Sequence, residues 1–328
     1  MTHSRVAYRD SFGCGPLEVS VEAETPALRD KVAESLCLHN VEWAEQPAAL
    51  RIEARMVDAP AEGLPGRFLE TARMRVDRVE GGLAATCDSG ASCVYAECER
   101  RWSIAVPANG AEAEIPEDVE LLVGLALTTG WRSLGWAPLH AGAVARGDVC
   151  ALLCAPSGGG KSTLIAALLR RGWHTLGDDK LLIRDDGTGP VAEALIHNFN
   201  LHPRTRDWFP EVGDLTRLPR YSAWTEKRKV RIEDIWPSAT CRTGRPTHLV
   251  RLERGGAEGT LDVRVLPRSE VLSILLRQVV IPNDAAAARP LLATLGALAG
   301  RLEGLEVVLG EDLYGDPDRL AALEDTLR

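Results

Sequence analysis

Several features are missing from this sequence, and their absence excludes whole classes of protein. The first fifteen residues, MTHSRVAYRDSFGCG, contain no apolar core that could act as a signal peptide. The most apolar helix candidate, residues 119–134, is too short to span a bilayer. There is also no internal repeat and no long low-complexity tract. We therefore expect a cytoplasmic protein that does not associate with membranes.

A basic charge balance is missing as well. The chain of 328 residues carries 38 Lys and Arg against 47 Asp and Glu, a formal net charge of −9. This argues against broad binding to nucleic acid or to acidic membranes, although a local basic pocket remains compatible with it. The eight cysteines form no C-x-x-C pair. Cys87, Cys93 and Cys98 cluster, which could indicate a metal site or a disulfide, but reduced thiols are the expectation for a cytosolic protein.

The first 116 residues predict a small α+β domain, mostly of antiparallel sheet, with few chemical signals. A helix is expected from Ala27 to Leu38, with Thr25 as its N-cap and Pro26 at its first position. Strands are indicated by alternating apolar residues at 17–23, 49–56, 73–79, 94–97 and 101–106. We expect this domain to recognise a substrate or partner.

A second domain, residues 117–328, is predicted to be an α/β catalytic domain. Ile115-Pro-Glu-Asp suits a helix start, and the helix over 117–134 is apolar nearly all round, so it should be buried. Residues 197–245 look irregular. Elsewhere strands are expected at 138–145, 149–154, 173–176, 180–184, 191–196, 247–253, 261–266 and 305–309, and helices at 268–281, 285–302 and 316–328.

The chemistry centres on the stretch from Val149 to Lys180. Its core, APSGGGKS, fits the phosphate-binding loop pattern G-x-x-x-x-G-K-[ST] except that Ala155 replaces the first glycine. Backbone N–H groups of such a loop, and the positive end of the following helix, bind polyphosphate. Lys161 is expected to reach the β- and γ-phosphates, and Ser162 to ligate Mg²⁺. The predicted nucleotide-binding residues are Ser157, Gly158, Gly159, Gly160, Lys161, Ser162 and Thr163.

Two adjacent carboxylates follow the loop. Asp178 lies 17 residues after Lys161, a distance that fits one helix and a short strand. In a parallel α/β unit this returns Asp178 and Asp179 to the sheet edge that carries the loop. There one carboxylate can hold Mg²⁺, and the other can take a proton from an attacking hydroxyl. His140, at the start of the preceding strand, could tune or orient such a carboxylate.

Together, these motifs resemble the HPr kinase/phosphorylase family, and the similarity is stronger to a diverged branch that includes tailoring kinases of lasso-peptide clusters. The resemblance covers roughly residues 118–280. It implies a P-loop kinase core related to phosphoenolpyruvate carboxykinase, which uses ATP and Mg²⁺ to phosphorylate a serine of a peptide or small protein. The roles it implies are Asp178 as general base, Asp179 as its metal-linked neighbour and His140 as the residue that assists the base.

The resemblance has gaps. The family's His-Gly is His140-Ala141 here, and the family's later signature, which supports phosphorylase activity, cannot be placed within residues 197–245. From that region Lys227 and Arg228 are predicted to stabilise the transferring phosphate, although a solvated basic loop would read the same way. A homo-oligomer is compatible with the sequence.

Two other functions fit the loop. One is a small-molecule kinase of the shikimate or gluconate type, in which a similar loop and aspartate occur. His140, the paired aspartates and the additional N-terminal domain argue against it. The other is a nucleotide-dependent regulatory or assembly ATPase. Neither an LSGGQ sequence nor an N-K-x-D sequence is present, which weakens that alternative.

Overall fold

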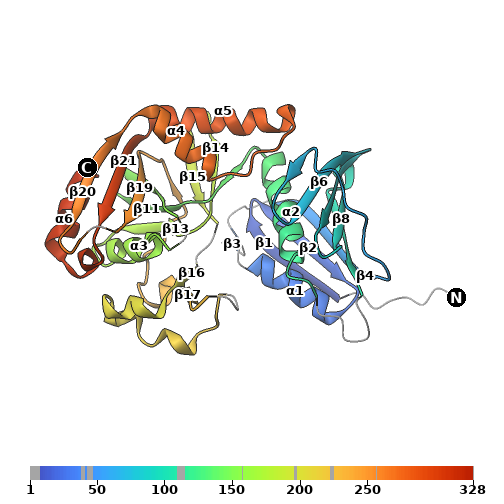
Figure 1. Cartoon of the computed structure of the whole chain (residues 1–328), viewed down its shortest axis with the longest axis horizontal. Coiled ribbons are helices and arrows are strands. Elements are labelled where there is room, and N and C mark those ends of the chain that lie inside the picture. The colour runs from blue at the N-terminus through green and yellow to red at the C-terminus, as the bar shows by residue number, and fades with distance from the viewer. Residues whose placement is uncertain are drawn as a thin grey trace. The chain divides into compact units, whose positions relative to one another are not determined.

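The chain divides into two compact units, which are described separately here. In the computed structural model, residues 8–37, 41–42, 47–108, 115–156, 158–195, 198–221, 225–255 and 257–327 are described. The first unit comprises Met1–Trp136 and Ile281–Pro290, and the second comprises Ala137–Val280 and Leu291–Arg328. Both contain helices and sheets, so the chain is a mixed α/β protein with several sheets (Figure 1).

The first unit is built on a nine-stranded sheet in the order β3-β1-β2-β4-β9-β8-β7-β6-β5. The pairs of β2 with β4 and of β4 with β9 are parallel, whereas β6 to β9 form an antiparallel meander. The sheet is therefore more mixed than the sequence predicts. Its strands are β1 (Tyr8–Gly15), β2 (Leu17–Ala23), β3 (Val41–Glu42), β4 (Ala48–Val57), β5 (Leu69–Glu70), β6 (Met74–Val79), β7 (Gly82–Cys87), β8 (Ser92–Ala96) and β9 (Arg101–Pro107).

Two helices pack against each other and against strands of this sheet: α1 (Pro26–Cys37) and α2 (Val119–Ser133). Thr25 caps α1 as predicted, because its hydroxyl accepts the Leu28 N–H at 3.2 Å. The α2 helix is buried, also as predicted, but it belongs to the first unit rather than to the second. Its Trp131 side chain is 1 % exposed and donates a 3.0 Å hydrogen bond to the Cys14 carbonyl of β1. The predicted boundary after residue 116 is therefore about twenty residues too early.

The predicted cysteine cluster lies in this unit. Cys87 and Cys93 are buried and Cys98 is exposed, and all three are free thiols. Burial raises the pKa of Cys87 to about 11, so this thiol is unreactive at neutral pH.

The second unit contains a six-stranded sheet in the order β13-β11-β12-β19-β21-β20. The strands β12, β19 and β21 are parallel neighbours, and β11 lies antiparallel between β12 and β13. Consequently β12 and β13 run in the same direction, and their carboxyl ends lie at the same edge. These strands are β11 (Gly142–Arg146), β12 (Val149–Cys154), β13 (His174–Gly177), β19 (His248–Arg254), β20 (Leu261–Leu266) and β21 (Glu303–Leu309).

Smaller sheets complete this unit. One has the order β10-β14-β15-β18, and the other is the antiparallel pair of β16 and β17. Their strands are β10 (Ala137–Leu139), β14 (Leu181–Asp185), β15 (Pro190–Ala194), β16 (Asn198–Leu201), β17 (Arg228–Arg231) and β18 (Thr243–Gly244). Because β16 and β17 are short and polar, the sequence pattern did not reveal them within the irregular region. The 3₁₀ helices η2 (Pro203–Asp207), η3 (Pro210–Val212) and η4 (Leu215–Arg217) lie between them.

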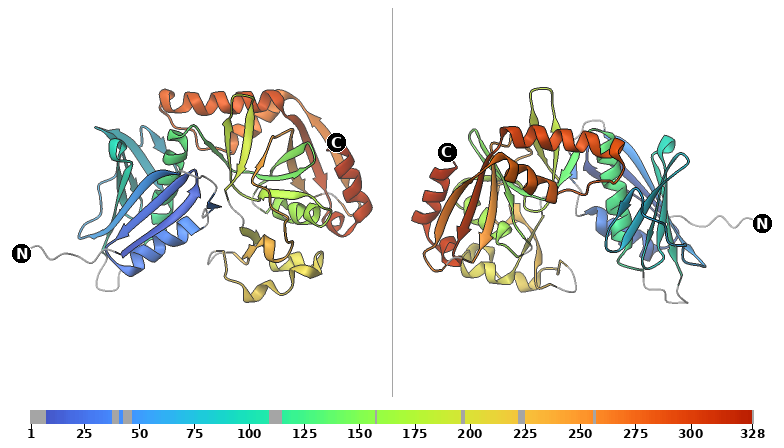
Figure 2. Two further views of the ribbon diagram at one scale, coloured as in Figure 1. Left: turned by 180° about the vertical axis from the view of Figure 1, so that it is seen from behind. Right: turned by 45° about the horizontal axis from the view of Figure 1, so that its top comes forward.

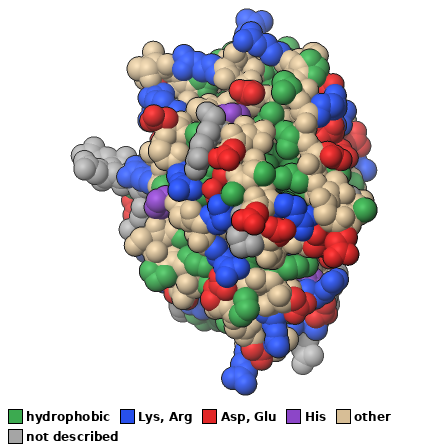
Figure 3. All heavy atoms as spheres, turned by 90° about the vertical axis from the view of Figure 1, so that its left-hand side faces the viewer, with side chains coloured by type: hydrophobic (Ala, Val, Ile, Leu, Met, Phe, Trp, Pro, Cys, Tyr) green, Lys and Arg blue, Asp and Glu red, His purple; other side chains and the backbone are tan. Residues whose placement is uncertain are grey.

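The helices of this unit are α3 (Lys161–Leu169), α4 (Arg268–Arg277) and α6 (Pro317–Thr326), together with α5 (Ala285–Arg301) from Leu291 onward, since the start of α5 belongs to the first unit. Six consecutive residues of α3, Leu164–Leu169, are buried beside β11, β13 and β16, so α3 packs against the sheet of this unit (Figure 2). Its amino end follows β12 after a short loop and therefore lies at the edge where β12 ends. No helix in the described ranges is long and apolar enough to cross a membrane. On the face shown in Figure 3, acidic and basic side chains are intermingled.

Candidate active site

The predicted phosphate-binding loop connects a buried strand, β12, to a helix, α3. Gly158 and Gly160 have φ values of 78° and 88°, which residues other than glycine rarely adopt. A Cβ on Gly160 would also lie 2.4 Å from the hydroxyl of Tyr314. Both glycines are therefore required by the local backbone, and the amino end of α3 is left open to an anion. Ser157 lies outside the described residues.

A β-bulge positions the two aspartates. The pairing of β11 with β13 shifts register between Ala143 and Val144, so that Leu176 is an extra residue in β13. The Thr175 hydroxyl holds this bulge, because it donates to the Ala143 carbonyl at 2.9 Å and accepts the Gly177 N–H at 2.9 Å. Asp178 and Asp179 follow directly, at the same sheet edge as the loop, as the spacing predicts.

Asp178 is held in the interior at this edge. Its side chain is 2 % exposed, and the Ser162 hydroxyl donates a 2.6 Å hydrogen bond to Oδ2. Burial raises the pKa of Asp178 to about 6, against the opposing effect of the Ser162 hydrogen bond. Its other oxygen, Oδ1, is buried without a hydrogen-bond partner in the described part of the chain.

Asp179 is more exposed and contacts different groups. Its Oδ1 lies 3.5 Å from His140 Nδ1 and 3.8 Å from Lys161 Nζ. The sequence predicts that His140 begins a strand. It lies instead between β10 and β11, where the chain passes from one sheet to another. Burial lowers the pKa of His140 below 6.5, which keeps the imidazole neutral at pH 7. The histidine thus contacts Asp179, whereas the family resemblance implies that it assists Asp178.

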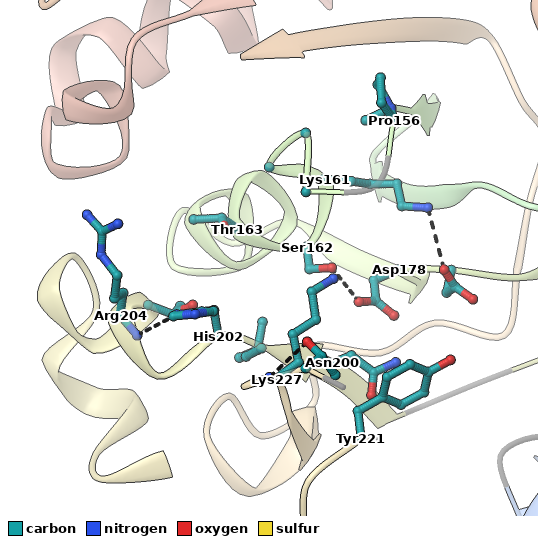
Figure 4. A pocket seen from close by; sticks show the side chains of 18 of the residues that line it. Pro156, Lys161, Ser162, Thr163, Asp178, Asn200, His202, Arg204, Tyr221 and Lys227 are labelled. Atoms are coloured by element: carbon teal, nitrogen blue, oxygen red, sulfur yellow. Dashed lines mark hydrogen bonds and ion pairs between the residues drawn. The ribbon is translucent and has the colours of Figure 1, made fainter. Parts of the chain in front are cut away.

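These side chains surround a pocket of about 480 Å³. Figure 4 shows Lys161, Ser162 and Asp178 at its centre. Further lining residues come from the region that looked irregular in sequence and from the loop after β21. They include Asn200, Leu201, His202, Arg204, Thr205, Trp208, Tyr221, Thr225 and Tyr314. Sequence reasoning missed them because only the fold brings them near the loop; the run His202-Pro-Arg-Thr-Arg was the one compositional signal.

Lys227 and Arg228 are neighbours with different surroundings. Lys227 lines the pocket and extends toward Ser162 and Asp178 (Figure 4). Arg228 is not among the described lining residues; its side chain is 12 % exposed, and its guanidinium donates to the Leu218 carbonyl at 3.2 Å. The pocket therefore favours Lys227, which directly precedes strand β17, over Arg228, the first residue of that strand, as the side chain that meets a transferring phosphate. The role of Arg228 stays a prediction.

Comparison with known proteins gives a distant likeness only. No family model matches the chain, and no curated protein is similar to it. Among solved structures, the chain is similar to the Hpr(Ser) kinase/phosphatase from Coxiella burnetii, with a TM-score of 0.32 and 9 % identity. That match covers 58 % of this chain and 96 % of the other.

The donor set of the pocket fits a hard divalent cation. Ser162 and Asp178 present oxygen ligands side by side. The buried Oδ1 of Asp178, which has no hydrogen-bond partner in the described residues, can coordinate such a cation. Mg²⁺ usually takes one or two protein ligands and completes its shell with water and phosphate oxygens. In the described residues no group of three or more His, Cys, Asp or Glu side chains is placed to hold a metal.

Proposed function

We propose that the chain is an ATP- and Mg²⁺-dependent kinase that transfers the γ-phosphate to a serine hydroxyl of a peptide or small protein. The observation that carries the proposal is the convergence of Lys161, Ser162, Asp178, Asp179 and His140 on one pocket at the amino end of α3. A cation, a metal-ligand pair and an accessible carboxylate are the groups that phosphoryl transfer needs.

The nucleotide would bind along the loop. Backbone N–H groups of Gly158–Thr163 and the amino end of α3 supply positive potential for the phosphates. The Lys161 ammonium lies 3.8 Å from Asp179 Oδ1, where it would contact the γ-phosphate. Ser162 and Asp178 would hold Mg²⁺, which neutralises charge on the phosphate oxygens when bound. Lys227 extends toward the same place and adds a second cation.

We assign the general base to Asp179 and the metal to Asp178, which reverses the roles that the resemblance implies for these two carboxylates. Its side chain is 40 % exposed, so an incoming hydroxyl can reach it, whereas Asp178 is buried. The acceptor oxygen forms a bond to the γ-phosphorus, the bond to the bridging oxygen breaks, and ADP leaves with the bonding electrons. The acceptor proton passes to Asp179. Neutral His140, 3.5 Å away, orients that carboxylate without neutralising its charge.

The acceptor is proposed from the sequence motifs. Their resemblance to tailoring kinases of lasso-peptide clusters supports a ribosomally made precursor peptide as the substrate. We assign its recognition to the first unit, since the pocket residues all come from the second. This arrangement leaves the chemistry to one unit and the choice of peptide to the other.

The test is phosphate transfer from labelled ATP to serine peptides, with the matching alanine peptides as negative controls. Asp179→Asn should lower turnover about 100-fold or more while retaining Mg·ATP binding. Asp178→Asn should weaken Mg²⁺ binding itself. The exposed Asp262→Asn is the matched control and should behave as wild type. Phosphorylation of a sugar or organic acid with no labelled peptide would refute the peptide acceptor, and unchanged turnover in Asp179→Asn would refute the base.

A further inference from the structure

Two segments distant in sequence meet beside the phosphate-binding loop. The ring of Trp208, directly after η2, contacts the ring of Tyr314 in an edge-on arrangement with centroids 5.4 Å apart. Arg204 of η2 pairs with Glu311 at 3.8 Å, and both Glu311 and Tyr314 belong to η6 (Glu311–Gly315). The Tyr314 hydroxyl lies 3.5 Å from the Gly160 carbonyl. These contacts join η2, η6 and the loop into one wall of the pocket.

Trp208 and Tyr314 have different exposure. Tyr314 is 2 % exposed and packs in the core, and its ring meets the indole edge-on, which holds the Trp208 side chain in place. Trp208 is half-buried and lines the pocket, which leaves part of its ring open to a ligand. An aromatic ring held in one orientation and open on one side is a surface on which a planar base can stack.

The direction of the bound nucleotide follows from the positions of the reacting groups. Lys161 and Asp179 fix the γ end, because the transferred phosphate must lie beside them. Figure 4 shows Arg204 on the Thr163 side of α3, whereas Lys227 and Tyr221 lie on the side of Asp178. We infer that the rest of a nucleoside triphosphate extends past Thr163 toward Arg204, on the side of the pocket that Trp208 also lines.

We propose that Trp208, supported by Tyr314, binds the base of the nucleotide, and that Arg204 contacts the ribose or the α-phosphate. This proposal rests on the proposed kinase function and deepens it. The side chain of Arg204 is 65 % exposed, so its guanidinium can turn from Glu311 to an anionic ligand. This placement of the nucleotide leaves the Tyr221 and Thr225 side of the pocket to the acceptor.

The test compares Mg·ATP with inorganic tripolyphosphate, which has the phosphates but no base. Trp208→Leu should weaken ATP binding about tenfold and leave tripolyphosphate binding unchanged. Trp208→Phe should restore most of the loss. Trp236→Leu is the matched control, because Trp236 is also half-buried and packs edge-on against Phe209, outside the pocket. Lys161→Ala should weaken both ligands.

The outcomes distinguish failure of the base site from failure of the kinase proposal. ATP binding within twofold of wild type in Trp208→Leu, or equal weakening of both ligands, overturns the base site while the kinase proposal stands. Wild-type protein that binds neither ligand overturns the kinase proposal and the base site with it. Photolabelling of the wild type with 8-azido-ATP needs no variant. Label within residues 204–208 or 311–315 is expected, and label at Tyr221 or Thr225 instead would overturn the proposed orientation.

Discussion

The Ser162 hydroxyl donates a 2.6 Å hydrogen bond to Oδ2 of Asp178, and this bond joins the first turn of α3 to the end of β13. It brings together a helix dipole, a hydroxyl and a buried carboxylate. Burial at this position disfavours the ionised carboxylate and raises the pKa of Asp178 to about 6. Removing its charge, or balancing that charge with a cation, should therefore change both stability and activity.

Asp178→Asn should stabilise the protein at pH 7.5. The pKa of Asp178 is about 6 in the folded state against 3.8 for a solvent-exposed aspartate. As the pH rises, the unfolded chain therefore loses the Asp178 proton at a lower pH than the folded protein does. Stability present below pH 3.8 is thus lost as the pH rises through about 6. The difference corresponds to about 3 kcal/mol at most. Urea unfolding of wild type and variant should show this gap at pH 7.5 and only a small one at pH 4.

The exposed Asp262→Asn provides the control, since it removes the same charge without a burial penalty. It should alter the unfolding free energy little at either pH. A variant Asp178→Asn that is less stable than wild type at pH 7.5 would contradict the raised pKa.

Mg²⁺ should compete with protons at Asp178. Only the ionised carboxylate binds the cation, so kcat/KM should fall below about pH 6 when Mg²⁺ is scarce. The acid limb should move to lower pH by up to about one unit for each tenfold increase in Mg²⁺. Calorimetric titration of Mg²⁺ against the protein between pH 5 and 8 measures the same competition without turnover. If the acid side of the kcat/KM profile does not move with Mg²⁺, the fall in activity at low pH is due to a group other than Asp178.

The part of the site that is local in sequence could be predicted. The strand, glycine turn and helix around Lys161 follow from residue types at fixed spacing, and one helix plus one strand return Asp178 to the same edge. The β-bulge that aims the aspartates could not be predicted, because it depends on a pairing between Thr175 and β11. Nor could the contact of His140 with Asp179, since β10 and β11 join different sheets.

The assignment of α2 failed for a related reason. A helix that is apolar nearly all round reveals that it is buried, but not which sheet covers it. Its partners, among them the Cys14 carbonyl and Leu17, lie more than a hundred residues earlier. Likewise Trp208 and Tyr314 become pocket residues only through the folded paths of η2 and η6.

Gly160→Ala should cost more stability than Gly172→Ala. Both glycines have φ above 80°, so each substitution incurs the left-handed penalty of about 1–2 kcal/mol. A Cβ at Gly172 meets nothing within 4 Å, whereas one at Gly160 meets the Tyr314 hydroxyl at 2.4 Å. The additional cost at Gly160, about 1 kcal/mol or more, should disappear when Tyr314 is replaced by Phe. Urea unfolding of the single and double variants measures this coupling, and additive effects would refute the contact.

The neighbours Lys227 and Arg228 should separate activity from stability. Lys227 extends into the pocket toward Ser162, so Lys227→Ala should lower kcat about 10- to 100-fold with little effect on unfolding. Arg228→Ala removes a mostly buried guanidinium that donates to the Leu218 carbonyl, and it should lower the free energy of unfolding by about 1–2 kcal/mol. Turnover at a temperature where both variants are folded, together with urea unfolding, measures the two effects. If Arg228→Ala reduces kcat more than Lys227→Ala at equal folded fraction, the basic side chain that serves the phosphate is Arg228, and the two positions exchange roles.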